Sequence, residues 1–530
     1  MKRITSKNGF YSEVKKARND DSTLLAPFGY AYDTRMLLHE CSYDKTMAEN
    51  PQRIRLIYEK LLGEGLLDTK LSTKIEAREA TDEELMLNHP KQLIEEIESL
   101  ETAEKCEEYC RDKEILWTCE KTMVSARVAA GATIEMVKAV HEGRIHNGFA
   151  IIRPPGHHSY GKTPRGYCIF NNAAIGAKYA LECLDMKKVA IVDFDYHAGN
   201  GTSESVKNDP RIHLTSIHAH HHGAFWPFTR EFDYATCNPN TLFVPLNGSM
   251  NTEADYVGIF HHVVLPQLRQ FGPELIIISA GFDAGYYDIM GSVGQGVKAH
   301  GYGHLARLLA EICPGRTLAV LEGGYFPKNY TESAAMMVRG LQGLDLPRIE
   351  VPKRLSAALV ETLWNLLHHH QEWYPELKNR LEKLIDHQKS LNLAPFVPDQ
   401  TLFFGDRMRK IYDDMIAHGI CRTREWFPEV TPAQSIEMCA KIDAYIAQYQ
   451  FSSHHSTPSE FELLAQLIWD AESRSDAYLQ SAPFTIALIS EYNDFVDGKL
   501  NNMIICDREL IRTAVEKGNL DKHQKYAHPL

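Results

Sequence analysis

The chain has 530 residues, 44% of them hydrophobic and 24% charged, a balance typical of a folded protein with a large core. A net charge of −13 argues against general nucleic-acid binding and is compatible with basic partners. No apolar run is long enough to span a membrane, no signal-peptide core is found near the start, and the eleven cysteines are scattered. We therefore expect an intracellular protein without direct nucleic-acid or membrane contact, with nucleus and cytoplasm equally open.

Three regions follow one another along the chain. Residues 1–27 are polar and mixed in charge, which predicts a loosely packed N-terminal arm, and residues 28–390 alternate strand and helix patterns. Residues 391–400 are typical of a linker, and residues 401–530 predict a C-terminal helical extension. Two helix starts in this extension combine an N-cap Thr, a Pro at the first helical position and a Gln or Glu placed for a capping box, at 431–434 and 457–460.

Apolar, β-branched runs recur through the large middle region and predict its strands. They cover residues 28–33, 149–152, 189–192, 212–217, 242–246, 275–279 and 317–321. Helical patterns separate several of them, at 52–61, 126–142, 173–184 and 256–271. This alternation predicts an α/β fold, a mostly parallel sheet flanked by helices, with its ligand site at the carboxyl ends of the strands.

Polar residues gather where the predicted strands end. The strand at 189–192 runs into Asp193, Asp195 and His197, which strand alternation directs to one side. An Asp-x-His pair supplies one oxygen and one nitrogen ligand, which suits Zn²⁺ with an open position for water. A hydrogen-bonded strand end without metal remains the alternative from this stretch alone. Other strand ends carry polar residues at 153–158, 216–218, 280–283 and 322–325.

Two further tracts have ordinary interpretations. The acidic stretch 81–108 is typical of a solvated helix face, and a negative rim that attracts a cationic substrate is the functional alternative. His368, His369 and His370 cannot all face one metal ion, because successive helical residues diverge by about 100° around the axis. We expect these three histidines to be exposed.

Several motifs together resemble the zinc-dependent histone deacetylase and acetylpolyamine amidohydrolase superfamily, which has an arginase-like fold. They are NPQRI at 50–54, RPPGHH at 153–158, GYCIFNNAAIGAKYA at 166–180, DFDYHAGNGT at 193–202, SAGFDA at 279–284 and LEGGY at 321–325. The sequences of the last three motifs, including Asn200 in the first of them, are more similar to the class II branch of the family than to class I. The resemblance covers about residues 28–390 and implies a deacetylase catalytic domain there.

The resemblance also implies roles for individual residues. Asp195, His197 and Asp283 match the zinc ligands, His157 and His158 match a tandem acid/base pair, and Tyr325 matches the donor to the oxyanion. In this family His157 pairs with Asp193 and His158 pairs with residue 200, here the neutral Asn200. A carboxylate partner favours the imidazolium and a neutral partner does not, so the two histidines should titrate differently. We expect His158 to be the principal acid and base.

Further positions concern the substrate and a second cation. The aromatic pair that would hold the lysine stem in a tunnel corresponds to Tyr167 and Trp226, with Gly166 allowing close backbone approach. A structural monovalent cation, expected to be potassium, matches Asp193, Asp195 and Ser216, and an arginine of an inner channel matches Arg53, for which an exposed helix arginine is the alternative. Met290 stands at the rim position that is glutamate in polyamine-specific members, which favours acetyl-lysine in proteins.

We therefore predict a zinc-dependent lysine deacetylase acting on an acetylated protein, such as a histone tail or tubulin. A first alternative is an amidohydrolase of acetylpolyamines or another small acetylated amine. A second alternative is an acyl-lysine-binding scaffold working through the C-terminal extension, which could also bind protein partners. One departure from the family is Ala198, which stands where a second histidine usually follows His197.

Overall fold

The structure is a computed structural model. It describes residues 27–68, 70–234, 238–248, 251–290, 296–349, 357–390, 392, 395–398, 403, 405–417 and 430–452. The predicted N-terminal arm, except Pro27, and the predicted helix start at 457–460 lie outside the described residues.

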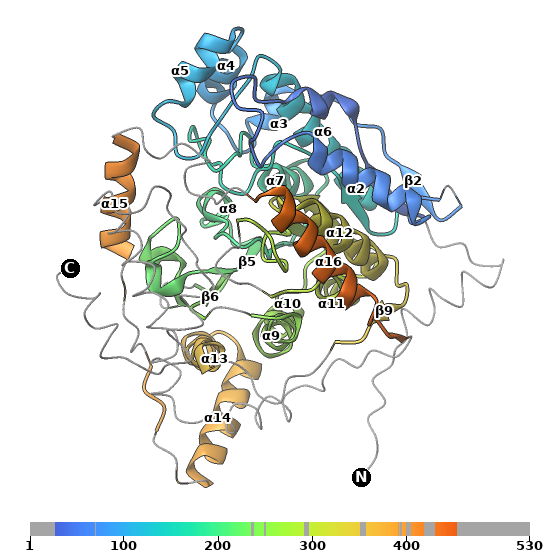
Figure 1. Ribbon diagram of the computed structural model, residues 1–530. Coiled ribbons are helices and arrows are strands. Elements are labelled where there is room, and N and C mark those ends of the chain that lie inside the picture. The colour runs from blue at the N-terminus through green and yellow to red at the C-terminus, as the bar shows by residue number, and fades with distance from the viewer. Residues whose placement is uncertain are drawn as a thin grey trace.

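An eight-stranded sheet forms the centre of the described part (Figure 1), and β9 (Leu346–Pro347) and β10 (Phe451–Ser452) form a separate antiparallel pair. In spatial order the strands of the eight-stranded sheet are β2 (Ser72–Lys74), β1 (Phe28–Ala31), β3 (Gly148–Ala150), β8 (Thr317–Leu321), β7 (Leu275–Ala280), β4 (Val189–Asp193), β5 (Ile212–Ala219) and β6 (Thr241–Leu246). Every neighbouring pair in this sheet is parallel, so the predicted parallel α/β sheet is confirmed. The short strand β2 was not predicted, because a three-residue edge strand carries little hydrophobic pattern.

Helices cover the sheet and bury its strands, except for the edge strand β2, whose Thr73 and Lys74 are exposed. The first helices are α2 (Gln52–Gly63), α3 (Asp82–Leu85), α4 (Lys91–Glu98), α5 (Ala103–Cys110), α6 (Thr122–His141), α7 (Asn172–Cys183) and α8 (Asn200–Val206). Later ones are α9 (Glu253–Ile259), α10 (Leu265–Phe271), α11 (Ala299–Ile312) and α12 (Pro327–Leu341). All five residues of β4 are buried, which explains its continuous apolar run.

The predicted helix at 256–271 is interrupted. A π-helical turn, η5 (Phe260–Val264), separates α9 from α10. Pro266 stands in the first turn of α10 and has no backbone N–H to donate to the preceding turn, so the regular α-helical ladder cannot run through it.

Four helices follow the sheet domain: α13 (Ala357–His370), α14 (Pro375–Ser390), α15 (Gly405–Ala417) and α16 (Pro432–Ile446). The predicted capping box is confirmed at α16, where Thr431 and Gln434 bond each other's backbone N–H groups. The expected exposure of the histidine tract is wrong, since His370 is fully buried and His368 and His369 are half-buried. Because successive helical residues point in different directions, this third histidine faces the core, and burial lowers its pKa to about 3.

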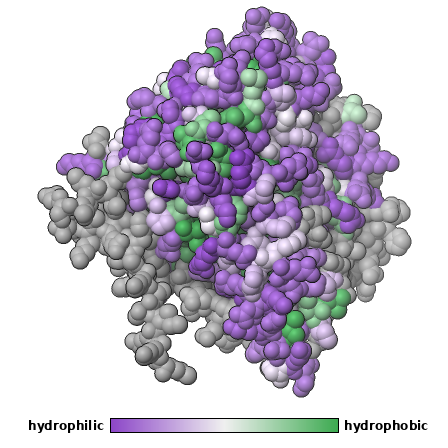
Figure 2. All heavy atoms as spheres, turned by 180° about the vertical axis from the view of Figure 1, so that it is seen from behind, coloured by the Kyte–Doolittle hydropathy of each residue, from purple (hydrophilic) through white to green (hydrophobic). Residues whose placement is uncertain are grey.

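The described surface is mostly hydrophilic on the side opposite to Figure 1, with a larger apolar area in its upper part and smaller ones below it (Figure 2). The acidic stretch behaves as a solvated face, since Glu95, Glu98, Glu104, Glu107 and Glu108 are exposed. Among the described helices, none is both long and apolar enough to cross a membrane.

Candidate active site

The candidate catalytic and metal-binding residues lie at or after the ends of five strands that are neighbours in the sheet: β3, β8, β7, β4 and β5. In a parallel sheet all carboxyl ends lie at the same edge, so the segments after these strands meet there. Asp195 and His197 follow β4, Asp283 follows β7, and Tyr325 follows β8. The strand order therefore brings these residues together at the carboxyl edge of the sheet, where the sequence predicted a ligand site.

Asp195, His197 and Asp283 form a compact group. One ligand atom from each lies within 4.8 Å of the other two, and all three side chains are buried. Nδ1 of His197 is 3.3 Å from Oδ1 of Asp195 and 3.1 Å from Oδ2 of Asp283. The close packing needs glycine at 281, because a Cβ there would stand 1.9 Å from Oδ2 of Asp195.

The charges of this group fit a cation at its centre. Burial and the neighbouring Asp195 carboxylate raise the pKa of Asp283 to about 6. Burial opposes a charge on His197 too, but its hydrogen bonds with Asp195 and Asp283 raise its pKa to about 9. Two buried carboxylates thus require positive charge beside them, and a proton on His197 supplies it here. Two oxygens and one nitrogen are also the donor set of a catalytic zinc site.

His157 and His158 lie beside this group with rings 3.8 Å apart and different partners. Nδ1 of His157 is 2.9 Å from Oδ2 of Asp193, and Nδ1 of His158 is 2.7 Å from Oδ1 of Asn200. Although burial opposes it, the carboxylates of Asp195 and Asp193 raise the pKa of His157 well above its usual range. Burial and the charges of His157 and His197 lower the pKa of His158 well below it. The two histidines therefore differ as expected.

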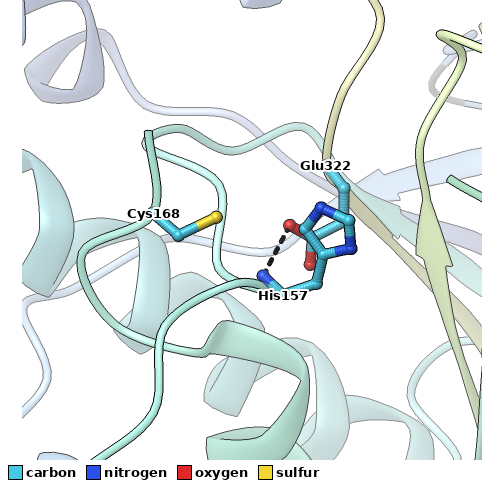
Figure 3. A group of neighbouring side chains, drawn as sticks. All are labelled: His157, Cys168 and Glu322. Atoms are coloured by element: carbon cyan, nitrogen blue, oxygen red, sulfur yellow. Dashed lines mark hydrogen bonds between the residues drawn. The ribbon is translucent and has the colours of Figure 1, made fainter. Parts of the chain in front are cut away.

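Glu322 holds the backbone of the tandem histidine turn (Figure 3). Its Oε2 accepts hydrogen bonds from the N–H groups of Gly156 at 2.7 Å and His157 at 3.1 Å. His157, Cys168 and Glu322 also lie close enough to share a metal ion, yet the Cys168 thiol donates to the Gly166 carbonyl at 3.3 Å. We interpret this group as a support for the turn. The motif pattern located Glu322 at a strand end but indicated no role for it.

Tyr325 lies on the other side of the site and is held by its backbone. Its N–H donates to Oδ2 of Asp288 at 2.7 Å, and its ring is 5.8 Å from that of Tyr167. Burial raises the pKa of Tyr325 well above its usual value, so its hydroxyl keeps its proton at neutral pH. Asp288 is a further residue at the site that the sequence did not single out, because Oδ2 accepts from the N–H groups of Tyr325 and Phe326, which are distant in the chain.

Arg53 is buried beneath Tyr325. Its guanidinium lies 4.9 Å from the centre of the Tyr325 ring, and its Nε donates to the Gly324 carbonyl at 2.7 Å. Its Nη1 pairs with Glu49 at 3.1 Å, and Glu49 also pairs with Arg153 at 2.7 Å. The alternative of an exposed helix arginine is wrong, since only 1% of Arg53 is exposed. Its role in an inner channel stays a prediction.

The predicted substrate residues lie around the histidines. Trp226 stands edge-on to His158 at 4.6 Å, and both Tyr167 and Trp226 are buried. Gly166 has a φ of +55°, and a Cβ there would stand 2.4 Å from Cδ2 of His158. This position therefore requires glycine, as expected from close backbone approach. Met290 is 5% exposed and packs in an apolar cluster with Tyr167 and, at its edge, Tyr325.

The predicted cation residues Asp193 and Ser216 are paired in the sheet register between β4 and β5. Oδ1 of Asp193 accepts from the N–H of Asp195 at 3.0 Å, and Oγ of Ser216 lies 3.0 Å from Nδ1 of His218. Both side chains are thus in place near one another and already have protein partners. Potassium stays a prediction.

Fold and site together define a class: a parallel α/β protein with a carboxylate and imidazole group suited to a catalytic metal, next to two buried histidines. The family model described as Histone deacetylase domain matches residues 47–341, more than half of the chain. The chain belongs to the histone deacetylase family and is class II-like, which confirms the resemblance.

Individual relatives agree with this membership. Histone deacetylase 15 of Arabidopsis thaliana is 32% identical over 78% of this chain and 76% of its own length. Histone deacetylase HDA1 of Candida albicans is 33% identical and Polyamine deacetylase HDAC10 of Mus musculus is 37% identical, over 66% and 56% of this chain. The chain spans 45% of each of these two. The crystal structure of the HDA15 HD domain matches with a TM-score of 0.61 and 32% identity, over 68% of this chain and 99% of that one.

Proposed function

We propose that the protein is a zinc-dependent deacetylase that hydrolyses acetylated lysine side chains of proteins. The observation that carries this proposal is the position of His158, a buried imidazole held by a neutral partner, beside the group of Asp195, His197 and Asp283. These three residues would hold zinc, which when bound polarises an amide carbonyl and lowers the pKa of a water ligand.

The chain's own residues supply the proton transfers. Asn200 accepts through Oδ1, so His158 carries its proton on Nδ1 and leaves Nε2 free to take a proton from water. The same nitrogen then gives that proton to the departing lysine amine. His157, held charged by Asp193, provides positive electrostatic support. Tyr325 keeps its hydroxyl proton and donates a hydrogen bond to the developing oxyanion.

Protein acetyl-lysine is the substrate that the side chains around the site favour. Tyr167 and Trp226 offer aromatic faces to an apolar four-carbon stem. Met290 packs beside Tyr167 and carries no charge to bind the distant ammonium of an acetylpolyamine. A small acetylated amine remains a second candidate, because relatives of this chain from three vertebrates are named polyamine deacetylases.

The experiment that tests the proposal compares acetate release from an acetyl-lysine peptide and from acetylspermidine. The zinc-loaded full chain is assayed beside its Tyr325→Phe variant and beside a chelated sample. Faster release from the peptide, abolished by chelation and strongly reduced in the variant, supports the proposal. Faster release from acetylspermidine would favour the second candidate, and no release from either would overturn both.

Three expectations accompany this function as proposals. A potassium ion at Asp193, Asp195 and Ser216 would stabilise the strand ends that carry the site. Histone tails, tubulin and other acetylated proteins are all open as substrates, in the nucleus or the cytoplasm. Partner binding through residues 401–530 stays a prediction, and residues 453–530 of that extension lie outside the described residues.

A further inference from the structure

Helix α15, from the predicted C-terminal extension, lies at the edge of the catalytic domain (Figure 1) and contacts the segment from His221 to Phe228. The ring of Tyr412 lies 5.3 Å from that of Phe228, two residues after Trp226. Arg409 forms an ion pair with Glu114 and a second one, at 3.0 Å, with Asp413 of its own helix. Glu114 is distant in sequence from both α15 and the motifs.

Glu114 connects α15 to both aromatic residues proposed to hold the lysine stem. Its carboxylate pairs with Arg165 as well as Arg409, and the Arg165 guanidinium lies 4.6 Å from the centre of the Trp226 ring. Its carbonyl oxygen accepts the N–H of Gly166 at 3.0 Å. In the same way, the next carbonyl, of Ile115, accepts the N–H of Tyr167 at 2.8 Å.

This arrangement depends on one carboxylate between two guanidinium groups. The side chains of Glu114 and Arg165 are 14% and 11% exposed, and that of Arg409 is 33% exposed. Burial and the charge of Arg409 lower the pKa of Arg165 to about 10, which reflects how close the two cations are. Without Glu114 the two guanidinium groups face each other with no carboxylate between them, and without Arg409 the Glu114 carboxylate loses its contact with α15 and keeps only Arg165 as a partner.

Helix α16 contacts a different segment near the site, the loop that contains Tyr286 and Tyr287. The ring of Tyr445 on α16 lies 5.7 Å from that of Tyr286, and the ammonium group of Lys441 lies 5.5 Å from the centre of the Tyr287 ring. Both tyrosines belong to the loop between Asp283 and Met290. The helices α15 and α16 therefore touch segments on two sides of the site without reaching its reacting groups.

We propose that Glu114 and Arg409 are positioning residues that hold Tyr167 and Trp226 in place, so that α15 tunes substrate affinity from outside the site. The catalytic part of this inference rests on the proposed function. Its structural part does not, because it concerns hydrogen bonds that exist in the protein without substrate.

The test uses the full chain with three substitutions. Arg409→Ala removes the outer cation, Glu114→Gln removes the central charge, and Arg409→Lys keeps the charge of the pair. Lys410→Ala is the matched control, because it removes one positive charge from an exposed neighbour on the same helix. Circular dichroism and zinc content first establish that each variant is folded and loaded.

Hydrogen exchange of the unliganded protein gives the readout that does not depend on activity. In Arg409→Ala we expect the amides of Gly166 and Tyr167 to exchange about tenfold faster, because the carbonyls that protect them lose their support. Lys410→Ala should leave these amides unchanged, and Arg409→Lys should restore most of the protection. Unchanged exchange in both Arg409→Ala and Glu114→Gln would overturn the inference, whether or not the protein proves to be a deacetylase.

Steady-state kinetics on the acetyl-lysine peptide gives the second readout. We expect Arg409→Ala to raise KM about tenfold while kcat falls less than about threefold, because binding is lost more than chemistry. The double variant Glu114→Gln/Arg409→Ala should be no worse than Glu114→Gln alone, since both act through one contact. Additive effects, or an equal rise of KM in Lys410→Ala, would contradict a shared positioning role.

Discussion

Oδ1 of Asn200 lies 2.7 Å from Nδ1 of His158, while the adjacent His157 faces the carboxylate of Asp193. Two neighbouring histidines thus have partners of different charge, a carboxylate for His157 and a neutral amide for His158. An amide oxygen can only accept, so it fixes the proton of His158 on Nδ1 and leaves Nε2 as the free nitrogen.

Replacement of Asn200 by Asp should raise the pKa of His158, because a carboxylate stabilises the imidazolium. The base form of His158 would then appear only at higher pH, and the acid limb of the kcat/KM profile should move up by about one pH unit or more. The measurement is a pH profile for acetyl-peptide hydrolysis by both proteins. If the acid limb does not move, another group controls it and His158 is not the base.

Tyr325→Phe should reduce kcat by about 10²- to 10³-fold, because it removes one donor to the oxyanion. The Tyr325 hydroxyl is the only group lost, while the backbone N–H that bonds Asp288 is retained. Zinc content and thermal stability should therefore remain close to those of the parent protein. A variant with unaltered kcat would exclude the proposed role of this hydroxyl.

Met290→Glu should shift preference toward acetylpolyamines. A carboxylate beside Tyr167 would attract a distant ammonium group, and its burial would weaken binding of a lysine that carries no second amine. We expect the ratio of acetylspermidine to acetyl-peptide kcat/KM to rise about tenfold. Met290→Leu controls for the loss of methionine packing, and an equal change in both variants would contradict the electrostatic reason.

Glu322→Gln should change the pH dependence of stability. Burial raises the pKa of Glu322 to about 7, although the charge of His157 opposes this rise. An acid whose pKa is higher in the folded state stabilises the fold below its unfolded pKa, and this contribution is lost as pH rises from about 4.5 to about 7. A glutamine at position 322 does not titrate, so its contribution to the free energy of unfolding does not change over this pH range.

We therefore expect Glu322→Gln to match the parent protein near pH 5 and to exceed its unfolding free energy at pH 8 by roughly 2 to 3 kcal/mol. Urea unfolding of both proteins at the two pH values measures this difference. A difference that is the same at both pH values would mean that Glu322 does not titrate as proposed.

The dependence of the site on α15 also changes how a truncation must be interpreted. Deleting residues 401–530 removes Arg409 and Tyr412 together with the rest of the extension. Loss of activity in such a truncation would therefore fail to separate a partner-binding role from a positioning role. The single substitution Arg409→Ala avoids this difficulty.

The sequence alone was sufficient for the elements whose signal is local. Apolar runs such as 189–192 and 275–279 predicted strands that are now β4 and β7, because a strand buried on both faces needs a continuous apolar stretch. The motifs around Asp195, His158 and Tyr325 placed these residues after strands, and all carboxyl ends of a parallel sheet meet at one edge.

Other features depend on segments that meet only in the folded chain. The sheet order places β8 between β3 and β7, so Glu322 reaches the backbone at Gly156 and His157. Asp288 binds the N–H of Tyr325, and Glu114 joins Arg165 to Arg409. Local pattern specifies which residues form strands and carry donors. Pairing across distant segments, which burial and charge balance select only in three dimensions, decides which residues hold the site in place.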